Sequence, residues 1–153
     1  MIRGYFHSRG GKCRPFVSAR FQFPSLDNRT LETRLLVDTG ADRTVLGPRD
    51  YKRLTRRFGL DFISLLPSVP GAGIGGRVNM RTLDALLTLP PFSTALTLNL
   101  WVPEPGNTPA IPSLLGRDVL SHFALFMEER TGQVLLLEEQ EAHQVAGDIY
   151  TFR

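Results

Sequence analysis

The sequence is short of cysteine and of long apolar runs. Cys13 is the only cysteine among 153 residues, so a disulfide within the chain is excluded, which fits a reducing compartment. It stands beside Gly10-Gly11-Lys12, where we expect a loop and no chemical role. No apolar run approaches the length of a membrane span, and residues 1–10 lack the apolar core of a signal peptide. These absences predict a cytoplasmic protein without membrane attachment.

The chain also lacks a strong excess of charge of one sign. Its formal net charge is +3, and nucleic-acid binding would need those charges gathered on one face. The dense cluster of cations, Lys52, Arg53, Arg56 and Arg57, falls on a predicted helix, where a solvated helix face is the expected reading. We therefore predict no nucleic-acid partner.

Several common catalytic and ligand-binding motifs are missing as well. No Gly-x-Ser-x-Gly elbow occurs. The Gly-rich segment 70–76 lacks the Gly-Lys-Ser/Thr ending of a phosphate-binding loop, and a strand pattern follows it instead of the helix of a dinucleotide site. His7, His122 and His143 do not stand at the spacing of metal ligands and are read as structural or surface residues.

The chain does contain many short alternating segments. Residues 16–23 alternate between apolar and polar side chains, and residues 31–37 return after the turn chemistry of 24–28, so the two segments predict a hairpin. The pattern of short strands with two short helices is typical of a mostly-β, barrel-like fold. Further strands are predicted at 62–66, from 78 onward, at 85–89, 96–102, 124–127 and 134–137.

Two helices are predicted. The first runs from Pro48 to about Phe58, since proline suits the first turn of a helix and Gly59 suits its end. The second covers 116–123. No second domain is apparent in the 153 residues, and the tail at 138–153 is left without an assigned role.

An acid in an unusual place is the central feature. Asp38 directly follows the apolar run 35–37, which has the character of a strand buried on both faces. Burying an unpaired carboxylate is costly, so such an acid caps something, pairs or performs chemistry. Thr39 offers a hydroxyl and Gly40 permits a tight turn. Taken alone, the tripeptide is more often an ordinary turn.

Two distant segments change that balance. Residues 70–76 contain the glycines of a β-hairpin tip, which can close over an extended substrate. Residues 111–120 form a second apolar run that ends in Gly116 and continues with Arg117 and Asp118 into a short helix. On their own, these two charges would be read as exposed residues at a helix start.

Together these motifs resemble those of retropepsins, the single-domain aspartic proteases of retroviruses and of related cellular and bacterial proteins. The resemblance covers about residues 16–137 and implies an all-β (mostly β) acid-protease barrel with two short helices and a β-hairpin flap, one lobe per chain. Three motifs carry it in the family's order: Asp38-Thr39-Gly40-Ala41-Asp42 with Thr44-Val45-Leu46, Gly73-Ile74-Gly75-Gly76, and Leu114-Leu115-Gly116-Arg117-Asp118-Val119-Leu120.

The resemblance assigns roles residue by residue. It makes Asp38 the catalytic carboxylate, with Thr39 and Gly40 completing the catalytic turn, and Arg117 a structural support that pairs with Asp42. The residues implied to contact a polypeptide substrate are Ala41 and Asp42 beside the acid and Gly73, Ile74, Gly75 and Gly76 in the flap. No metal or organic cofactor is implied.

The chemistry needs two carboxylates that share a proton around one water. The chain has eight Asp, yet Asp38 alone is followed by Thr-Gly or Ser-Gly. A second copy of the chain would therefore supply the partner acid, and a two-fold homodimer brings the two together. The sequence thus predicts a homodimeric aspartic endopeptidase that hydrolyses peptide bonds.

Some features depart from the family pattern and leave alternatives open. Residues 48–58 insert a helix that the shortest viral enzymes lack, Arg43 stands where many viral members have an acid, and the tail extends beyond residue 137. One alternative is a non-catalytic peptide-binding or scaffold module on a protease fold. Another is an inactive precursor whose tail occupies the cleft or blocks dimerisation.

Overall fold

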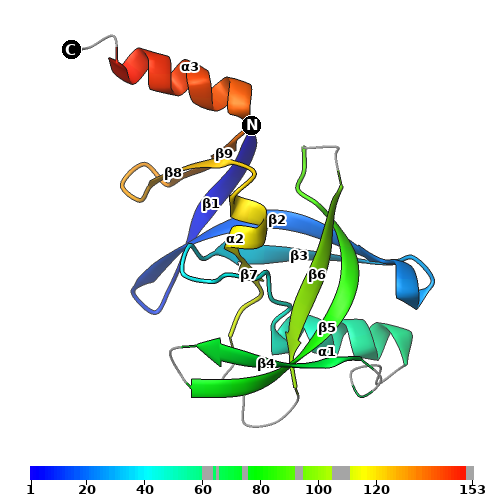
Figure 1. The fold of residues 1–153 in the computed structure, drawn as a ribbon. Coiled ribbons are helices and arrows are strands. Elements are labelled where there is room, and N and C mark those ends of the chain that lie inside the picture. The colour runs from blue at the N-terminus through cyan, green and yellow to red at the C-terminus, as the bar shows by residue number, and fades with distance from the viewer. Residues whose placement is uncertain (60–63, 65, 74–75, 92–94, 105–110, 151–153) are drawn as a thin grey trace.

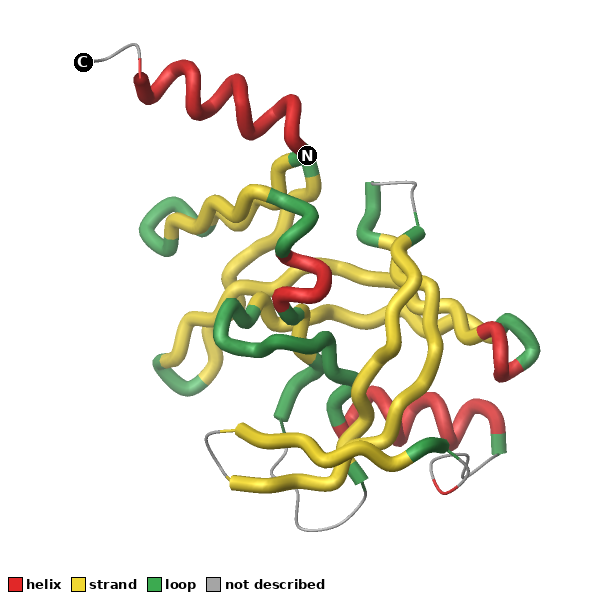
Figure 2. Tube along the Cα trace, in the orientation of Figure 1, coloured by secondary structure: helices red, strands yellow, loops and turns green. Residues whose placement is uncertain are grey.

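The computed structural model describes residues 1–59, 64, 66–73, 76–91, 95–104 and 111–150. Strands make up most of the trace, as Figure 2 shows in yellow. In the described residues they are β1 Ile2–Arg9, β2 Lys12–Phe23, β3 Arg29–Val37, β4 Ser68–Gly73, β5 Gly76–Thr88, β6 Leu96–Pro103, β7 Leu114–Leu115, β8 Ala124–Glu128 and β9 Gln133–Leu137. The helices are α1 Pro48–Phe58, α2 Arg117–Leu120 and α3 Glu139–Tyr150, with a 3-10 turn at Pro24–Leu26. The mostly-β prediction is confirmed, and the described part of the chain contains three α-helices where two were expected.

The strands form one hydrogen-bonded sheet in the order β4-β5-β2-β1-β9-β8. Strand β3 lies beside β2 and also pairs with β7, while β6 pairs with β5. The β3–β7 pairing is parallel and the other pairings between these strands are antiparallel. The strand β8 ends the order, and no described strand pairs with its outer edge.

The alternation in the sequence places the core as predicted. On β2, the side chains of Val17, Ala19, Phe21 and Phe23 are buried, while the residues between them face outward or lie half-buried. Such a strand buries one face against the core and leaves the other toward solvent. The hairpin of β2 and β3 is confirmed by a continuous antiparallel register.

The first helix begins and ends where the sequence predicts. It starts at Pro48 and is followed by Gly59, which adopts a left-handed conformation with φ of 67°. The Gly59 N–H donates to the Thr55 carbonyl at 2.8 Å, which closes the last turn. Tyr51 and Leu54 lie on its buried face, so the helix packs by its apolar side.

Both ends of the chain differ from the expectations. Residues 2–9 form β1, which the local pattern did not predict because it pairs with β9 from the far end of the chain. Cys13 lies in β2 opposite Ser8, so the predicted loop at Cys13 is wrong. The tail forms α3, which extends away from the sheet beside the N-terminus in Figure 1. Within the described residues, α3 lies apart from the loop that follows β3 in this view.

The strand predicted at 62–66 cannot be compared along its whole length, and the helices can be checked for a membrane span. The segment predicted at 62–66 lies mostly outside the described residues, and Ser64 and Leu66 are not in a strand. No helix in the described part of the chain is long and apolar enough to cross a membrane.

Candidate active site

Asp38 stands at the end of β3 in a tight turn. Its backbone N–H donates to the Leu115 carbonyl at 3.1 Å, and its own carbonyl accepts from the Ala41 N–H at 3.2 Å. The Gly40 N–H donates to Oδ1 of Asp38 at 3.0 Å. The Asp38 residue is half-buried, whereas Thr39 and Gly40 are exposed. The turn therefore holds the carboxylate in place and leaves it open to solvent on one side.

Strand β7 fixes the position of this turn. It lies between β3 and the segment that follows the turn, with Leu36 donating to the Ser113 carbonyl at 2.9 Å. On its other side, Val45 donates to the Leu114 carbonyl at 3.0 Å and Leu114 donates back to Val45 at 2.9 Å. Because both ends of the turn are bonded to the same strand, the acid cannot shift without breaking backbone hydrogen bonds.

The start of α2 supports the Asp38 turn through hydrogen bonds. The Arg117 N–H donates to the Ala41 carbonyl at 2.8 Å, and the Asp118 N–H donates to the Asp42 carbonyl at 3.2 Å. The expected ion pair is present, with Arg117 Nη2 lying 2.7 Å from Asp42 Oδ1. Both side chains are largely exposed, at 66% and 78%, and such pairs contribute about 0–1 kcal/mol. The backbone bonds therefore carry most of this brace.

A second acid, Asp118, contributes more than the sequence indicated. Its Oδ2 accepts from the Thr44 N–H at 3.0 Å, and its Oδ1 accepts from the Thr44 hydroxyl at 2.7 Å. Thr44 is fully buried, and its Oγ1 in turn accepts from the Gly116 N–H at 3.1 Å. The sequence signal was a polar Thr44 directly before the apolar Val45 and Leu46, but it pointed to no particular partner.

Gly116 is required by the close passage of two backbones. A Cβ at this position would lie 2.4 Å from the carbonyl carbon of Arg43 and 2.5 Å from its oxygen. Those atoms are backbone and cannot move aside without moving the turn. The glycine thus lets α2 approach the loop that carries the acid.

The predicted flap segment lies at the end of the β4–β5 hairpin. The two strands pair continuously from Ser68 opposite Arg81 to Gly73 opposite Gly76. Ile74 and Gly75, which the sequence placed at the tip, lie outside the described residues. The structure therefore brings the two flanking glycines together.

The base of this hairpin is tied to the body of the sheet. Arg81 forms an ion pair with Glu104 at 2.6 Å and donates to the Leu66 carbonyl at 2.8 Å. Both charged side chains are mostly buried, at 25% and 28% exposed. Arg81 and Glu104 belong to separate segments of unremarkable composition, so no local sequence pattern predicts that they pair.

In Figure 1 the end of the β4–β5 hairpin lies at the lower left of the view, below the loop that follows β3. Within the described residues no group of three His, Cys, Asp or Glu side chains is placed to hold a metal ion. The arrangement offers one carboxylate, an adjoining exposed turn and the β4–β5 hairpin.

Comparison with solved structures defines the fold. The chain has the fold of the retropepsin-like aspartic proteases, which it matches over most of its length. A retropepsin-like aspartic protease from Rickettsia conorii aligns with a TM-score of 0.57 and 19% sequence identity, covering 87% of this chain and 87% of that chain. EIAV protease in complex with the inhibitor HBY-793 aligns with a TM-score of 0.46 and 21% identity, covering 75% of this chain and 92% of that one. No family model matches the chain, and no curated protein matches its sequence.

Proposed function

We propose that the chain is an aspartic endopeptidase that acts as a homodimer, with one Asp38 carboxylate from each subunit. The observation that carries this proposal is the Asp38 turn itself. The acid is held by its neighbours Gly40 and Leu115, and it remains half-exposed at the end of a buried strand. A retropepsin-like fold that bears such a turn supports peptide-bond hydrolysis as the reaction.

The reaction requires a second carboxylate close to the first. One ionised carboxylate takes a proton from a water as the water oxygen bonds to the peptide carbonyl carbon, and the protonated partner polarises the carbonyl oxygen. The C–N bond then breaks as a carboxyl proton passes to the leaving amine, which leaves one proton shared by the pair. Two carboxylates close enough to share one proton titrate as a pair, as is general for aspartic proteases. The chain has a single Asp-Thr-Gly, so the partner acid comes from a second copy on a two-fold axis.

The open edge of β8 supports this assembly. The intrachain order β1-β9-β8 ends on β8, and an unpaired edge is a template for pairing with another strand. Phe126 and Met127 on this strand are 42% and 43% exposed, although both are large and apolar. Pairing of β8 with its symmetry mate would cover both side chains and continue the sheet across the axis.

The surrounding residues have roles that follow from their positions in the proposal. Ala41 and Asp42 continue the exposed turn beside the acid, so they would contact the substrate backbone. The β4–β5 hairpin would cover an extended peptide and exclude bulk water, with Gly73, Ile74, Gly75 and Gly76 at its end. Thr39 would hold the two turns together across the axis.

The central experiment combines a substitution with a mixing test. Purified protein is expected to cleave an unfolded polypeptide at mildly acidic pH, and Asp38→Asn should reduce the rate roughly 10³-fold or more. Asp84→Asn is the matched control, because Asp84 is exposed and bonds to Asn99 at 2.9 Å. It should leave the rate unchanged.

Mixing separates a shared site from a site within one chain. Excess Asp38→Asn protein should inhibit the wild-type protein, because mixed dimers hold one carboxylate. Cleavage that survives Asp38→Asn contradicts the reaction. Cleavage that is lost in Asp38→Asn but is insensitive to mixing contradicts the shared site. Peptide binding without cleavage at acidic and neutral pH would favour a binding module.

A further inference from the structure

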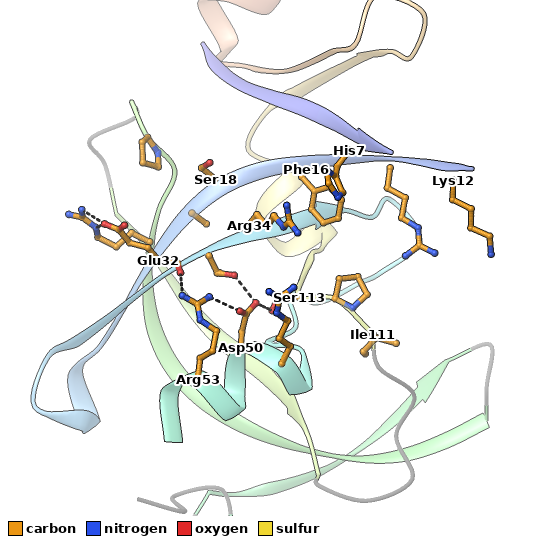
Figure 3. A pocket seen from close by; sticks show the side chains of 17 residues that line it. His7, Lys12, Phe16, Ser18, Glu32, Arg34, Asp50, Arg53, Ile111 and Ser113 are labelled. Carbon is orange, nitrogen blue, oxygen red and sulfur yellow. Dashed lines mark hydrogen bonds and ion pairs between the residues drawn. The ribbon is translucent and has the colours of Figure 1, made fainter. Parts of the chain in front are cut away.

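A basic hollow lies between β2, β3, the start of α1 and residues 111–113, apart from the Asp38 turn. Its volume is about 780 Å³, and none of residues 38–42 lines it. Figure 3 shows its side chains, with Lys12 at one end and Glu32 at the other. This volume lies within the range of roughly 300–1,000 Å³ that is typical of ligand sites. We call it the basic pocket.

The lining of the basic pocket is strongly cationic. Six of its residues are Lys or Arg and two are acidic, Glu32 and Asp50, so the lining alone exceeds the formal net charge of +3 of the whole chain. Both acids are already engaged: Glu32 pairs with Arg20 at 2.6 Å and Asp50 pairs with Arg53 at 3.0 Å.

Four cations of the lining have no counter-charge among the described residues. None of them forms an ion pair with a described carboxylate. Like charges gathered in a hollow repel one another, and an anionic ligand would relieve that repulsion. The four are Lys12, Arg14, Arg34 and Arg49.

One of these cations is held in place before any ligand arrives, and another lies at the start of a helix. The guanidinium of Arg34 lies over the ring of Phe16, 5.4 Å from its centroid. Arg49 lies in the first turn of α1, which has no side-chain cap, so its charge adds to the positive end of the helix dipole. Both features favour an anion at this position.

The basic surface continues beyond the basic pocket. The exposed face of α1 carries Arg49 and Arg53, which also line the basic pocket. The same face carries Lys52 and Arg56, two members of the cluster that the sequence predicted to be a solvated helix face. A track of this extent fits an elongated polyanion better than a single small anion.

The lining favours an acidic peptide over a single-stranded nucleic acid. Nucleic-acid channels combine cations with exposed aromatic rings on which bases stack. Besides His7, the aromatic ring of this lining is Phe16, which is 7% exposed and lies beneath Arg34. Arginine clusters of this kind recognise carboxylate side chains, often through two parallel hydrogen bonds.

We propose that the basic pocket binds an acidic peptide segment, a short run of Asp and Glu side chains carried by another protein. Lys12, Arg14, Arg34 and Arg49 receive the carboxylates, and the exposed cations of α1 contact the continuation of the segment. The proposal of this binding site rests on the residues that line the basic pocket and does not require the Asp38 reaction. If the chain is a protease, the basic pocket selects polypeptides that carry such a segment away from the cleaved bond.

The test measures binding directly, by fluorescence anisotropy of a labelled peptide rich in Asp and Glu. The wild-type protein should bind this peptide, bind its Asn and Gln counterpart at least about tenfold more weakly, and lose affinity as salt is added. Arg14→Gln/Arg49→Gln should weaken binding about tenfold or more. Both side chains are exposed, so the fold should survive, which circular dichroism verifies.

The matched control removes the same charge elsewhere. Arg3→Gln/Arg130→Gln alters two exposed arginines outside the basic pocket and should change the affinity less than twofold, a difference of about 0.4 kcal/mol. If both double variants lost affinity for the acidic peptide equally, or if neither lost any, the proposed site would be wrong. Tighter binding of a single-stranded oligonucleotide through Arg14 and Arg49 would overturn the peptide assignment. Asp38→Asn should bind the acidic peptide like the wild type, which keeps this result separate from the cleavage assay.

Discussion

Asp38 and Asp50 lie close together in the sequence, yet the chain treats their carboxylates in opposite ways. Asp50 is 7% exposed and accepts hydrogen bonds from the Thr33 and Ser113 hydroxyls at 2.6 and 2.7 Å, in addition to its pair with Arg53. Asp38 is half-buried and, among the described residues, its carboxylate accepts from the Gly40 N–H.

The two carboxylates differ in how many of their acceptor sites are occupied by protein groups. We call Asp50, whose sites are mostly occupied, the closed acid and Asp38 the open acid. A carboxylate has about four acceptor sites. At Asp50, three side chains from β3, α1 and the segment before β7 occupy most of them, so this acid joins elements. At Asp38, most sites remain for water and for a second carboxylate. Changes at closed contacts should therefore alter stability, and changes at open ones should alter assembly or activity.

The largest effect on stability is expected at Asp50. Asp50→Ala removes the acceptor of two hydroxyls and leaves Arg53 without its partner. Arg53 is 53% exposed and can be solvated, but a buried hydroxyl left without its acceptor costs about 1–3 kcal/mol, so the free energy of unfolding in urea should fall by at least that amount. Asp84→Ala, at an exposed acid, should change it by less than about 0.5 kcal/mol. Similar effects at the two positions would remove the distinction between a closed and an exposed acid.

Gly116→Ala should have the next largest effect. The added methyl group would lie 2.4 Å from the carbonyl carbon of Arg43, and overpacking of this kind costs about 1–3 kcal/mol. Because the strain falls on the loop that carries Asp38, the cleavage rate should fall together with the urea midpoint. A variant with unchanged stability and unchanged activity would show that α2 does not brace the turn.

The proposed pairing of β8 across the dimer can be tested by substituting an exposed apolar side chain on this strand. In the proposed dimer, Phe126→Lys would place like charges on the two symmetry-related strands, which is unfavourable across paired strands. It should raise the dissociation constant about tenfold or more, or 1.4 kcal/mol. Sedimentation analysis measures this change.

Val145→Lys provides a closely matched control for that experiment. Val145 has the same exposure of 42% as Phe126 but lies on α3, so its substitution should leave the dimer intact. In the mixing assay, Asp38→Asn protein that also carries Phe126→Lys should no longer inhibit the wild type. Equal effects of the two lysine substitutions would place the interface elsewhere.

The smallest effect concerns Cys13, which reports on the β8–β9 turn. Partial burial, and then the nearby carboxylate of Glu129, raise the pKa of the Cys13 thiol above its usual range. Because the thiolate is the reactive form, alkylation by iodoacetamide should be slow at neutral pH and rise with a midpoint above that of a free cysteine. Glu129→Gln should lower that midpoint and speed alkylation a few-fold. An unchanged profile would show that Glu129 does not act on Cys13.

Local pattern predicted the elements that depend on local chemistry. The alternation on β2 and β3, and the proline and glycine that bound α1, were visible in the sequence because each acts within its own segment. The Asp38 turn was visible for a similar reason, as an acid placed directly after a buried run. The pairing of Arg117 with Asp42 came from the resemblance and is present in the structure.

Features that join distant segments could not be predicted in this way. Strand β1 pairs with β9 from the far end of the chain, and the sequence of residues 2–9 does not predict that pairing. The bonds from Thr44 to Asp118 connect residues 74 apart. The basic pocket gathers cations from β2, β3 and α1, each of which reads as an ordinary surface charge in its own segment.

The parallel pairing of β3 with β7 has a consequence for the newly made chain. Leu36 and Val37 pair with Leu114 and Leu115, so the turn at Asp38 obtains its support from residues that are synthesised much later. Contacts between such distant segments form late in folding. A chain still emerging from the ribosome therefore carries the acid without the geometry that holds it, and the Asp38 turn is completed only after residues 114–115 have been made.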